Sequence, residues 1–124
     1  MRKILIVVGY ENLGALCQDE LRDQGYEVEL AHTGAEAVHK MTKSSPDLIV
    51  IDLMGGEWKW ASLLGHIKGM KIRPSVIVNT IWSRAEEGRK TLVADAFLTE
   101  WPDICELKRK VRDVLEGAPR RPVV

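Results

Sequence analysis

The sequence lacks the features that mark several large classes of protein. Its 124 residues include two cysteines, Cys17 and Cys105, too few for the disulfide framework of a small secreted domain. Eighteen basic residues balance eighteen acidic ones, so no excess of one charge indicates nucleic acid or a membrane surface as a partner. The apolar runs are too short for a signal peptide or a membrane span. We therefore expect a cytoplasmic protein with reduced cysteines in its core.

What the chain does contain is the composition of one globular domain. Hydrophobic residues make up 45% of the chain and charged residues 29%, which is ordinary for a chain that buries a core. The length falls within the roughly 100–200 residues usual for one domain. We expect this domain to cover residues 1–117, because Gly117 and Pro119 end the last helical pattern and leave a flexible tail over 118–124.

Strand and helix patterns alternate five times along the chain. The expected strands are Ile4–Val8, Glu27–Leu30, Leu48–Ile51, Val76–Val78 and Ala96–Leu98. Helical spacing follows them over residues 13–21, 33–41, 63–67, 84–93 and 103–115. Helix caps are expected at Asn12, at Thr33 with Glu36, and at Asp103 with Glu106. Five such units predict an α/β fold, a doubly wound parallel sheet of five strands in the order 2-1-3-4-5 with helices on both faces.

Asp52 is the most informative single residue. It follows the buried run Leu48–Ile51, and an open α/β sheet places its chemistry where such strands end. The first strand instead leads into Val8 and Gly9, so no carboxylate stands at its end. His32, His39 and His66 share no metal-binding spacing, and we expect them to be ordinary surface or helix-edge residues.

All four tryptophans follow predicted strands, so we expect them on one rim of the sheet. They are Trp58 and Trp60 after the third strand, Trp82 after the fourth and Trp101 after the fifth. One interpretation is an aromatic collar that binds a partner, because tryptophan is enriched among interface hot spots. The other is that Trp82 and Trp101 turn inward and fill space at the site.

Six segments together have the order and spacing of a known family. They are Lys3–Val7, Gly25–Val28, Thr33–Ala37, Pro46–Met54, Val76–Thr80 and Ala94–Leu98. The chain resembles, along nearly its whole length, the CheY-like receiver domain of bacterial response regulators. The resemblance implies that Asp52 matches the aspartate that accepts a phosphoryl group from a histidine kinase. It also implies that Thr80 matches the hydroxyl residue that closes on the phosphate, and Phe97 the aromatic that rotates inward behind it.

Three positions that neutralise charge in the family's phosphorylation site depart from its pattern. Val8 and Gly9 stand where the family has two acids, and Glu100 aligns with its lysine. Phosphoryl transfer depends on positioning and charge neutralisation, which the family achieves with Mg²⁺ held by carboxylates. We therefore expect no bound metal or other cofactor and impaired phosphorylation at Asp52.

The resulting hypothesis is a stand-alone receiver-like signalling module of a two-component or phosphorelay system. It would not be an enzyme, and its partner would be a histidine kinase, a phosphotransfer protein or an output protein. In a more modest interpretation, Asp52 is a strand-end hydrogen-bond acceptor and Phe97 a core residue.

Two other functions stay open. One is a working phosphoacceptor that recruits Glu11 or Glu57 as a metal ligand. The other is a flavodoxin-like cofactor-binding protein, although the segment 9–14 lacks a loop suited to cradle a phosphate.

Overall fold

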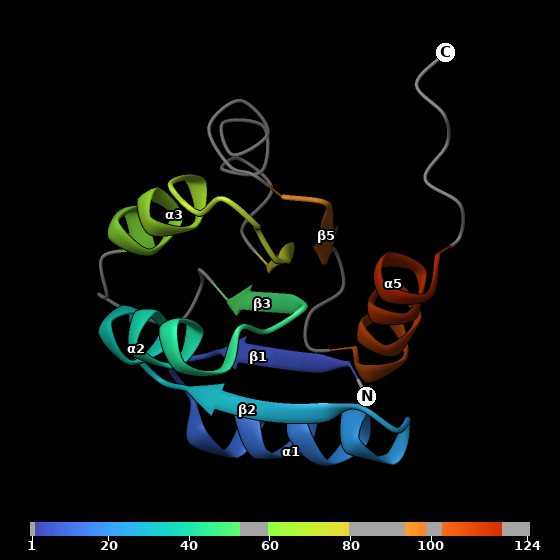
Figure 1. The fold of residues 1–124 in the computed structure, drawn as a ribbon. Coiled ribbons are helices and arrows are strands. Elements are labelled where there is room, and N and C mark those ends of the chain that lie inside the picture. Colours follow the sequence, from blue (N-terminus) through green and yellow to red (C-terminus); the bar gives the residue numbers. More distant parts are fainter. Residues whose placement is uncertain (1, 53–59, 80–93, 99–102, 118–124) are drawn as a thin grey trace.

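The structure, a computed structural model, describes residues 2–52, 60–79, 94–98 and 103–117, with the side chains of 60–62 left out (Figure 1). Five strands in these ranges form one parallel sheet in the order β2-β1-β3-β4-β5, which confirms the predicted order. The strands are β1 (Lys3–Val7), β2 (Glu27–Ala31), β3 (Leu48–Asp52), β4 (Ser75–Asn79) and β5 (Ala96–Leu98).

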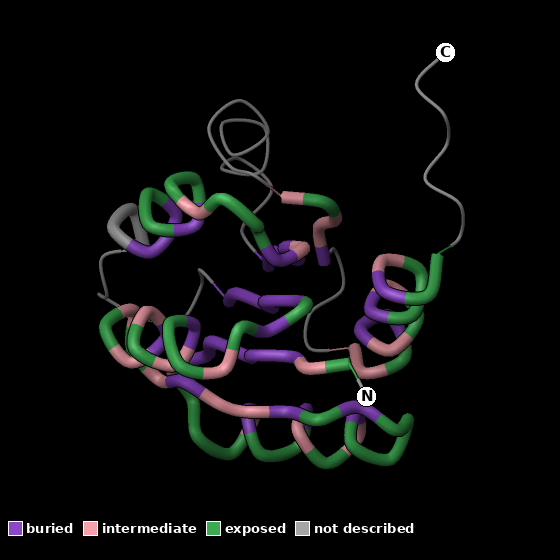
Figure 2. The backbone as a smooth tube through the Cα atoms, viewed as in Figure 1, coloured by how far each residue is buried: buried purple, intermediate pink, exposed green. Residues whose placement is uncertain are grey.

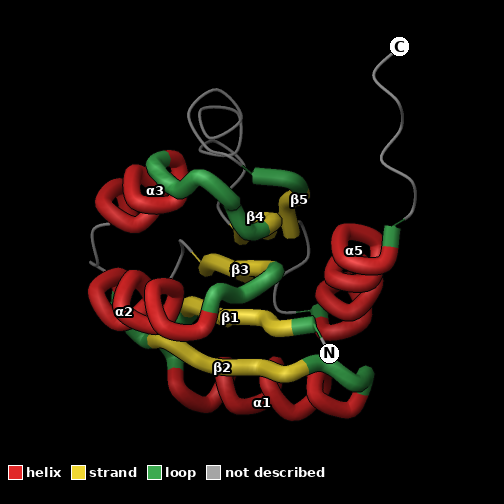
Figure 3. Tube along the Cα trace, in the orientation of Figure 1, coloured by secondary structure: helices red, strands yellow, loops and turns green. Residues whose placement is uncertain are grey.

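Helices cover both faces of the sheet (Figure 3). They are α1 (Glu11–Asp23), α2 (Gly34–Ser44), α3 (Trp60–Lys68) and α5 (Ile104–Glu116). One hydrophobic cluster joins the sheet to α1 and α5, and a second joins it to α2 and α3. The predicted helix over 84–93 lies outside the described residues.

Strand alternation distributes the core between these two clusters. In β1, Ile4 and Ile6 belong to the α1–α5 cluster, whereas Leu5 and Val7 belong to the α2–α3 cluster. The central strands β1 and β3 are therefore buried on both sides (Figure 2), which explains why they are nearly continuous runs of branched apolar residues. The strand order places the end of β3 in the middle of the sheet.

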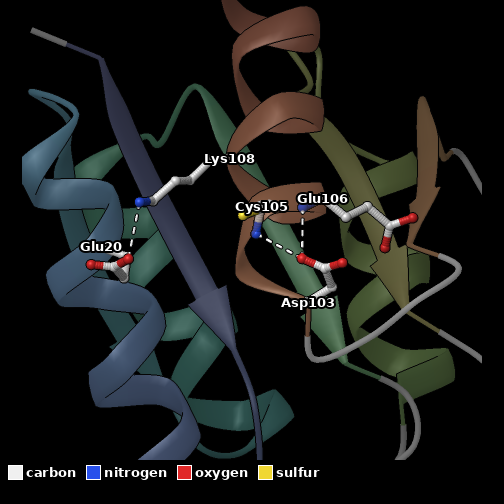
Figure 4. Close-up of polar contacts among 5 residues, drawn as sticks. All are labelled: Glu20, Asp103, Cys105, Glu106 and Lys108. Carbon is white, nitrogen blue, oxygen red and sulfur yellow. Dashed lines mark hydrogen bonds and ion pairs between the residues drawn. The ribbon is translucent and has the colours of Figure 1, made fainter.

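Two of the predicted helix caps are present. Thr33 Oγ1 accepts a hydrogen bond from the Glu36 amide at 3.1 Å. Asp103 Oδ1 accepts from the amides of Cys105 and Glu106 at 2.8 and 3.2 Å (Figure 4). These side chains satisfy amides that the first helical turn leaves unpaired.

The predicted cap at Asn12 is wrong. Helix α1 begins at Glu11 with Tyr10 as its N-cap, and no side chain caps it. The Tyr10 carbonyl already accepts from the Gly14 amide at 3.0 Å, so the helical hydrogen bonding begins before Asn12. Asn12 therefore lies inside the first turn.

Side chains close the outer edge of β2. The Val28 carbonyl accepts from Gln18 Nε2 at 2.9 Å and from Arg22 Nη2 at 3.2 Å. Lys40 Nζ donates to the Leu30 carbonyl. Because an unpaired strand edge is a template for pairing with another chain, these contacts disfavour strand addition by a partner at β2.

Two contacts tie α5 to the rest of the α1 side. Lys108 Nζ lies 2.9 Å from Glu20 Oε1 on α1 (Figure 4). Tyr26 Oη donates to Glu116 Oε2 at 3.2 Å. The ion pair reaches solvent and contributes little to stability, so the buried face of α5 supplies most of its attachment.

Candidate functional site

Asp52 is the last residue of β3 and lies at the C-terminal edge of the sheet. Its strand lies between β1 and β4, and in register Asp52 is opposite Asn79. The residue is only 3% exposed. A carboxylate in this position needs hydrogen-bond donors, because an ionised group deprived of water is costly unless it is paired.

Asn79 supplies such a donor. Its Nδ2 donates to Asp52 Oδ1 at 2.9 Å, and the asparagine is itself only 4% exposed. A hydrogen bond to an ionised acceptor is stronger than one between neutral groups. Asn79 was not among the site residues predicted from the sequence. Its signal was a polar residue ending the apolar run Val76–Val78, at the same edge as Asp52.

Val8 follows β1 and belongs to the hydrophobic core. Its side chain is fully buried in the cluster that includes Cys17 and Leu21. Its amide donates to the Ala31 carbonyl at 3.0 Å, and its carbonyl lies 3.0 Å from His32 Nδ1. Both backbone groups of Val8 are thus engaged, and the side chain is packed.

His32 lies directly before Thr33, the N-cap of α2, and so at a helix edge. It is half-buried beside the end of β1, and its ring contacts the Val8 carbonyl. Because a carbonyl oxygen only accepts, Nδ1 carries the proton in this contact. His39 and His66 are exposed, as predicted.

Cys17 lies close enough to Asp52 to be affected by its charge. Burial raises the pKa of the Cys17 thiol from 9.0 to about 11, and the negative charge of Asp52 adds to the effect. Cys17 is therefore a buried, protonated thiol at neutral pH. The prediction of a core cysteine is wrong for Cys105, which is exposed on the first turn of α5.

The described residues do not fit a magnesium site. Magnesium requires near-octahedral oxygen ligands, commonly one or two carboxylates with water. At the end of β1 the Val8 side chain is apolar and buried, and its carbonyl is engaged by His32. Within the described ranges, no group of three or more His, Cys, Asp or Glu residues is arranged to hold a metal ion. Glu11 is exposed at the start of α1, and Glu57 lies outside the described residues.

Phe97 is half-buried in β5, in register with Val78 of β4. Its side chain packs against the α2–α3 cluster. Its carbonyl accepts from Lys110 Nζ, and that ammonium is 3.6 Å from the carboxylate of Glu106, which is only 3% exposed. A hydrogen bond from Lys110 therefore joins the backbone of Phe97, the predicted switch residue, to α5.

The other predicted site residues are placed only in part. Gly9 is half-buried in a bend after β1, and Trp60 is the first residue of α3. Outside the described residues lie the side chain of Trp60 and all of Thr80, Trp58, Trp82, Glu100 and Trp101. The tryptophan rim and the Thr80 switch stay predictions from the sequence.

Comparison with known proteins establishes the family. The response regulator receiver domain matches residues 4–99, and the chain belongs to this family. Response regulator ArlR of Staphylococcus saprophyticus is 26% identical over 125 residues, covering 100% of this chain and 57% of the relative. The alkaline phosphatase synthesis transcriptional regulatory protein PhoP of Bacillus subtilis is 30% identical, covering 92% of this chain and 48% of the relative. The chain thus spans about half the length of these curated relatives.

Solved structures agree with this assignment. The response regulator TrrA of Thermotoga maritima, in complex with Mg²⁺ and BeF, is 29% identical with a TM-score of 0.79, covering 93% of this chain and 100% of that one. The signal receiver domain of a histidine kinase from Syntrophus aciditrophicus is 28% identical with a TM-score of 0.82, covering 100% and 97%. The protein is a receiver domain of two-component signalling, a class that interacts with histidine kinases. Within the described residues, no helix has both the length and the apolar character needed to cross a membrane.

Proposed function

We propose that this receiver domain signals through contacts with other proteins, and that conventional Mg²⁺-dependent phosphorylation of Asp52 is impaired. The observation that carries the proposal is the burial of Val8, at the position of the family's first acid. Its side chain is 0% exposed, and both of its backbone groups are bonded. Presenting an oxygen ligand here would require rebuilding the core at the end of β1.

The charge balance supports the same conclusion. A phosphoryl group adds negative charge to the carboxylate that accepts it, and catalysis consists largely of positioning and neutralising that charge. Asn79 holds Asp52 with a neutral amide, which donates a hydrogen bond but carries no positive charge. The sequence also replaces the family's lysine with Glu100. An additional acid near the site would oppose phosphorylation further.

The proposed partner is a histidine kinase, a phosphotransfer protein or an output protein. The curated relatives are a response regulator and a transcriptional regulatory protein, of which this chain covers about half. Because side chains from α1 and α2 occupy the outward carbonyls of β2, recognition would use helix faces or loops in preference to this strand edge.

A second candidate is a working phosphoacceptor with unusual metal ligands. It is favoured by the 29% identity to TrrA, whose structure contains Mg²⁺ and BeF. Exposed Glu11 would be one such ligand.

Intact-mass spectrometry distinguishes the two candidates. The protein would be incubated with Mg²⁺ and acetyl phosphate, beside an Asp52→Asn variant and a receiver domain that retains both acids. We expect the retained-acid control to gain one phosphoryl group and this protein to stay unmodified. Stoichiometric addition that disappears in Asp52→Asn would overturn the proposal and establish the second candidate.

A further inference from the structure

The polar residues that end β3 and β4 form a buried pair. Asp52 and Asn79 are opposite each other in register, and their side chains are 2.9 Å apart from Oδ1 to Nδ2. They lie two residues after Val50 and Ile77, whose side chains belong to the α1–α5 cluster. Strand alternation therefore places both polar side chains on that same face of the sheet.

The chemistry of the pair sets its orientation. An ionised carboxylate only accepts hydrogen bonds, whereas an asparagine side chain has an NH₂ donor and a carbonyl acceptor. Only the NH₂ end of Asn79 can therefore face Asp52. A hydrophobic residue at 79 would remove this donor from a buried carboxylate, and an acid there would put two like charges together.

We propose that Asn79 is the positioning residue that makes Asp52 a fixed hydrogen-bond acceptor, joining the ends of β3 and β4. The inference rests on the proposed function, because it assigns Asp52 a role that needs no phosphoryl transfer. In this role the carboxylate requires a hydrogen-bond donor opposite it, and the amide supplies that donor. Each residue therefore limits which side chain can occupy the other position. The hydrogen bond between them needs one donor and one acceptor, so exchanging the two residues should preserve that bond.

The first test converts the pair into two acids. In Asn79→Asp, two carboxylates share a buried site, and one must stay protonated for the pair to persist. The unfolded chain releases both protons near the ordinary values for aspartate, so the folded state is penalised as pH rises. Relative to the wild type, we expect the melting temperature to fall by about 10 °C or more between about pH 4 and about pH 7.

The second test exchanges the two residues. The double variant Asp52→Asn with Asn79→Asp restores one amide and one carboxylate, with donor and acceptor on opposite strands. We expect it to recover most of the lost melting temperature and the wild-type pH profile. Asn12→Asp is the matched control, because Asn12 is exposed on α1, and it should show no comparable pH dependence. A role in filling space alone would not produce a rescue that depends on pH.

NMR supplies a direct signature of the bond. One side-chain amide proton of Asn79 should exchange slowly with water in the wild type and rapidly in Asp52→Ala. The inference is overturned if the exchanged variant is as unstable as Asn79→Asp, if Asn79→Asp keeps the wild-type pH profile, or if the amide exchanges equally in both proteins. Phosphorylation of the wild type by acetyl phosphate would instead overturn the proposed function, and a successful rescue would be unaffected by that result.

Discussion

Gly14 lies directly against Val8, so that a Cβ atom on residue 14 would come within 2.9 Å of Val8 Cγ1. Gly14 is in the first half of α1 and is buried, and Val8 follows β1. Such a separation is shorter than packed carbon atoms tolerate. The close packing of α1 on Val8 therefore depends on a glycine at residue 14. Through this packing, the position of the family's first acid is part of the hydrophobic core.

Replacing Gly14 with alanine should destabilise the domain even though alanine favours helices. Alanine gains about 1 kcal/mol of helix propensity over glycine, but overpacking a core costs about 1–3 kcal/mol. We expect a net loss in the free energy of unfolding, measured with urea. In a Val8→Ala background the same change should become stabilising. Gly65→Ala is the matched control, because a Cβ there meets nothing within 4 Å, and it should stabilise α3. A loss of stability in both backgrounds would show that Val8 is not the contact responsible.

Restoring the first acid alone should be costly. Val8→Asp places a carboxylate in a side-chain position that is fully buried, and an unpaired buried charge costs about 3–5 kcal/mol. Gly9→Asp should cost less, because Gly9 is half-buried. If the scaffold is able to hold the metal, Mg²⁺ should raise the melting temperature of the variant that combines both changes with Glu100→Lys. Thermal unfolding with and without Mg²⁺ measures both effects. Equal stability of Val8→Asp and the wild type at neutral pH would contradict the burial argument.

The buried thiol of Cys17 should make the protein less stable in alkali. Its folded pKa is raised from 9.0 to about 11 by burial and by Asp52, so the unfolded chain loses this proton first as pH rises. The associated stability is complete below about pH 9 and is lost as pH approaches about 11, amounting to at most about 3 kcal/mol. Urea unfolding as a function of pH should show this loss. Cys17→Val should reduce it, whereas Cys105→Ser, at an exposed position, should leave it unchanged. An identical alkaline profile for Cys17→Val would show that other groups cause it.

Phe97 should occupy one conformation when the domain is isolated. Its ring packs on the α2–α3 cluster, and its carbonyl accepts from Lys110, which pairs with buried Glu106. A two-state switch moves only if a ligand binds the two states differently. We expect flat NMR relaxation-dispersion profiles for Phe97 and its neighbours in β5. Millisecond exchange broadening across these residues in the unliganded protein would show that a second state is already populated.

The sequence alone determined the order of the elements and the place of Asp52. Three of these features are local: strand alternation, the helix caps at Thr33 and Asp103, and the apolar run before Asp52. Each depends on residues that are only a few positions apart in the chain. The order of the sheet followed because strand–helix units of this length leave few ways to connect parallel strands. These features are independent of which distant side chains meet.

Only the tertiary structure decided how Asp52 is held and what surrounds it. Asn79 becomes its donor because two strands that are distant in sequence end in register. Val8 is core and His32 half-buried because β1, β2 and α1 meet at one place. The exposure of Cys105 also depends on how α5 lies on the sheet. Such properties arise from packing between segments far apart in the chain, which a local pattern of residue types does not encode.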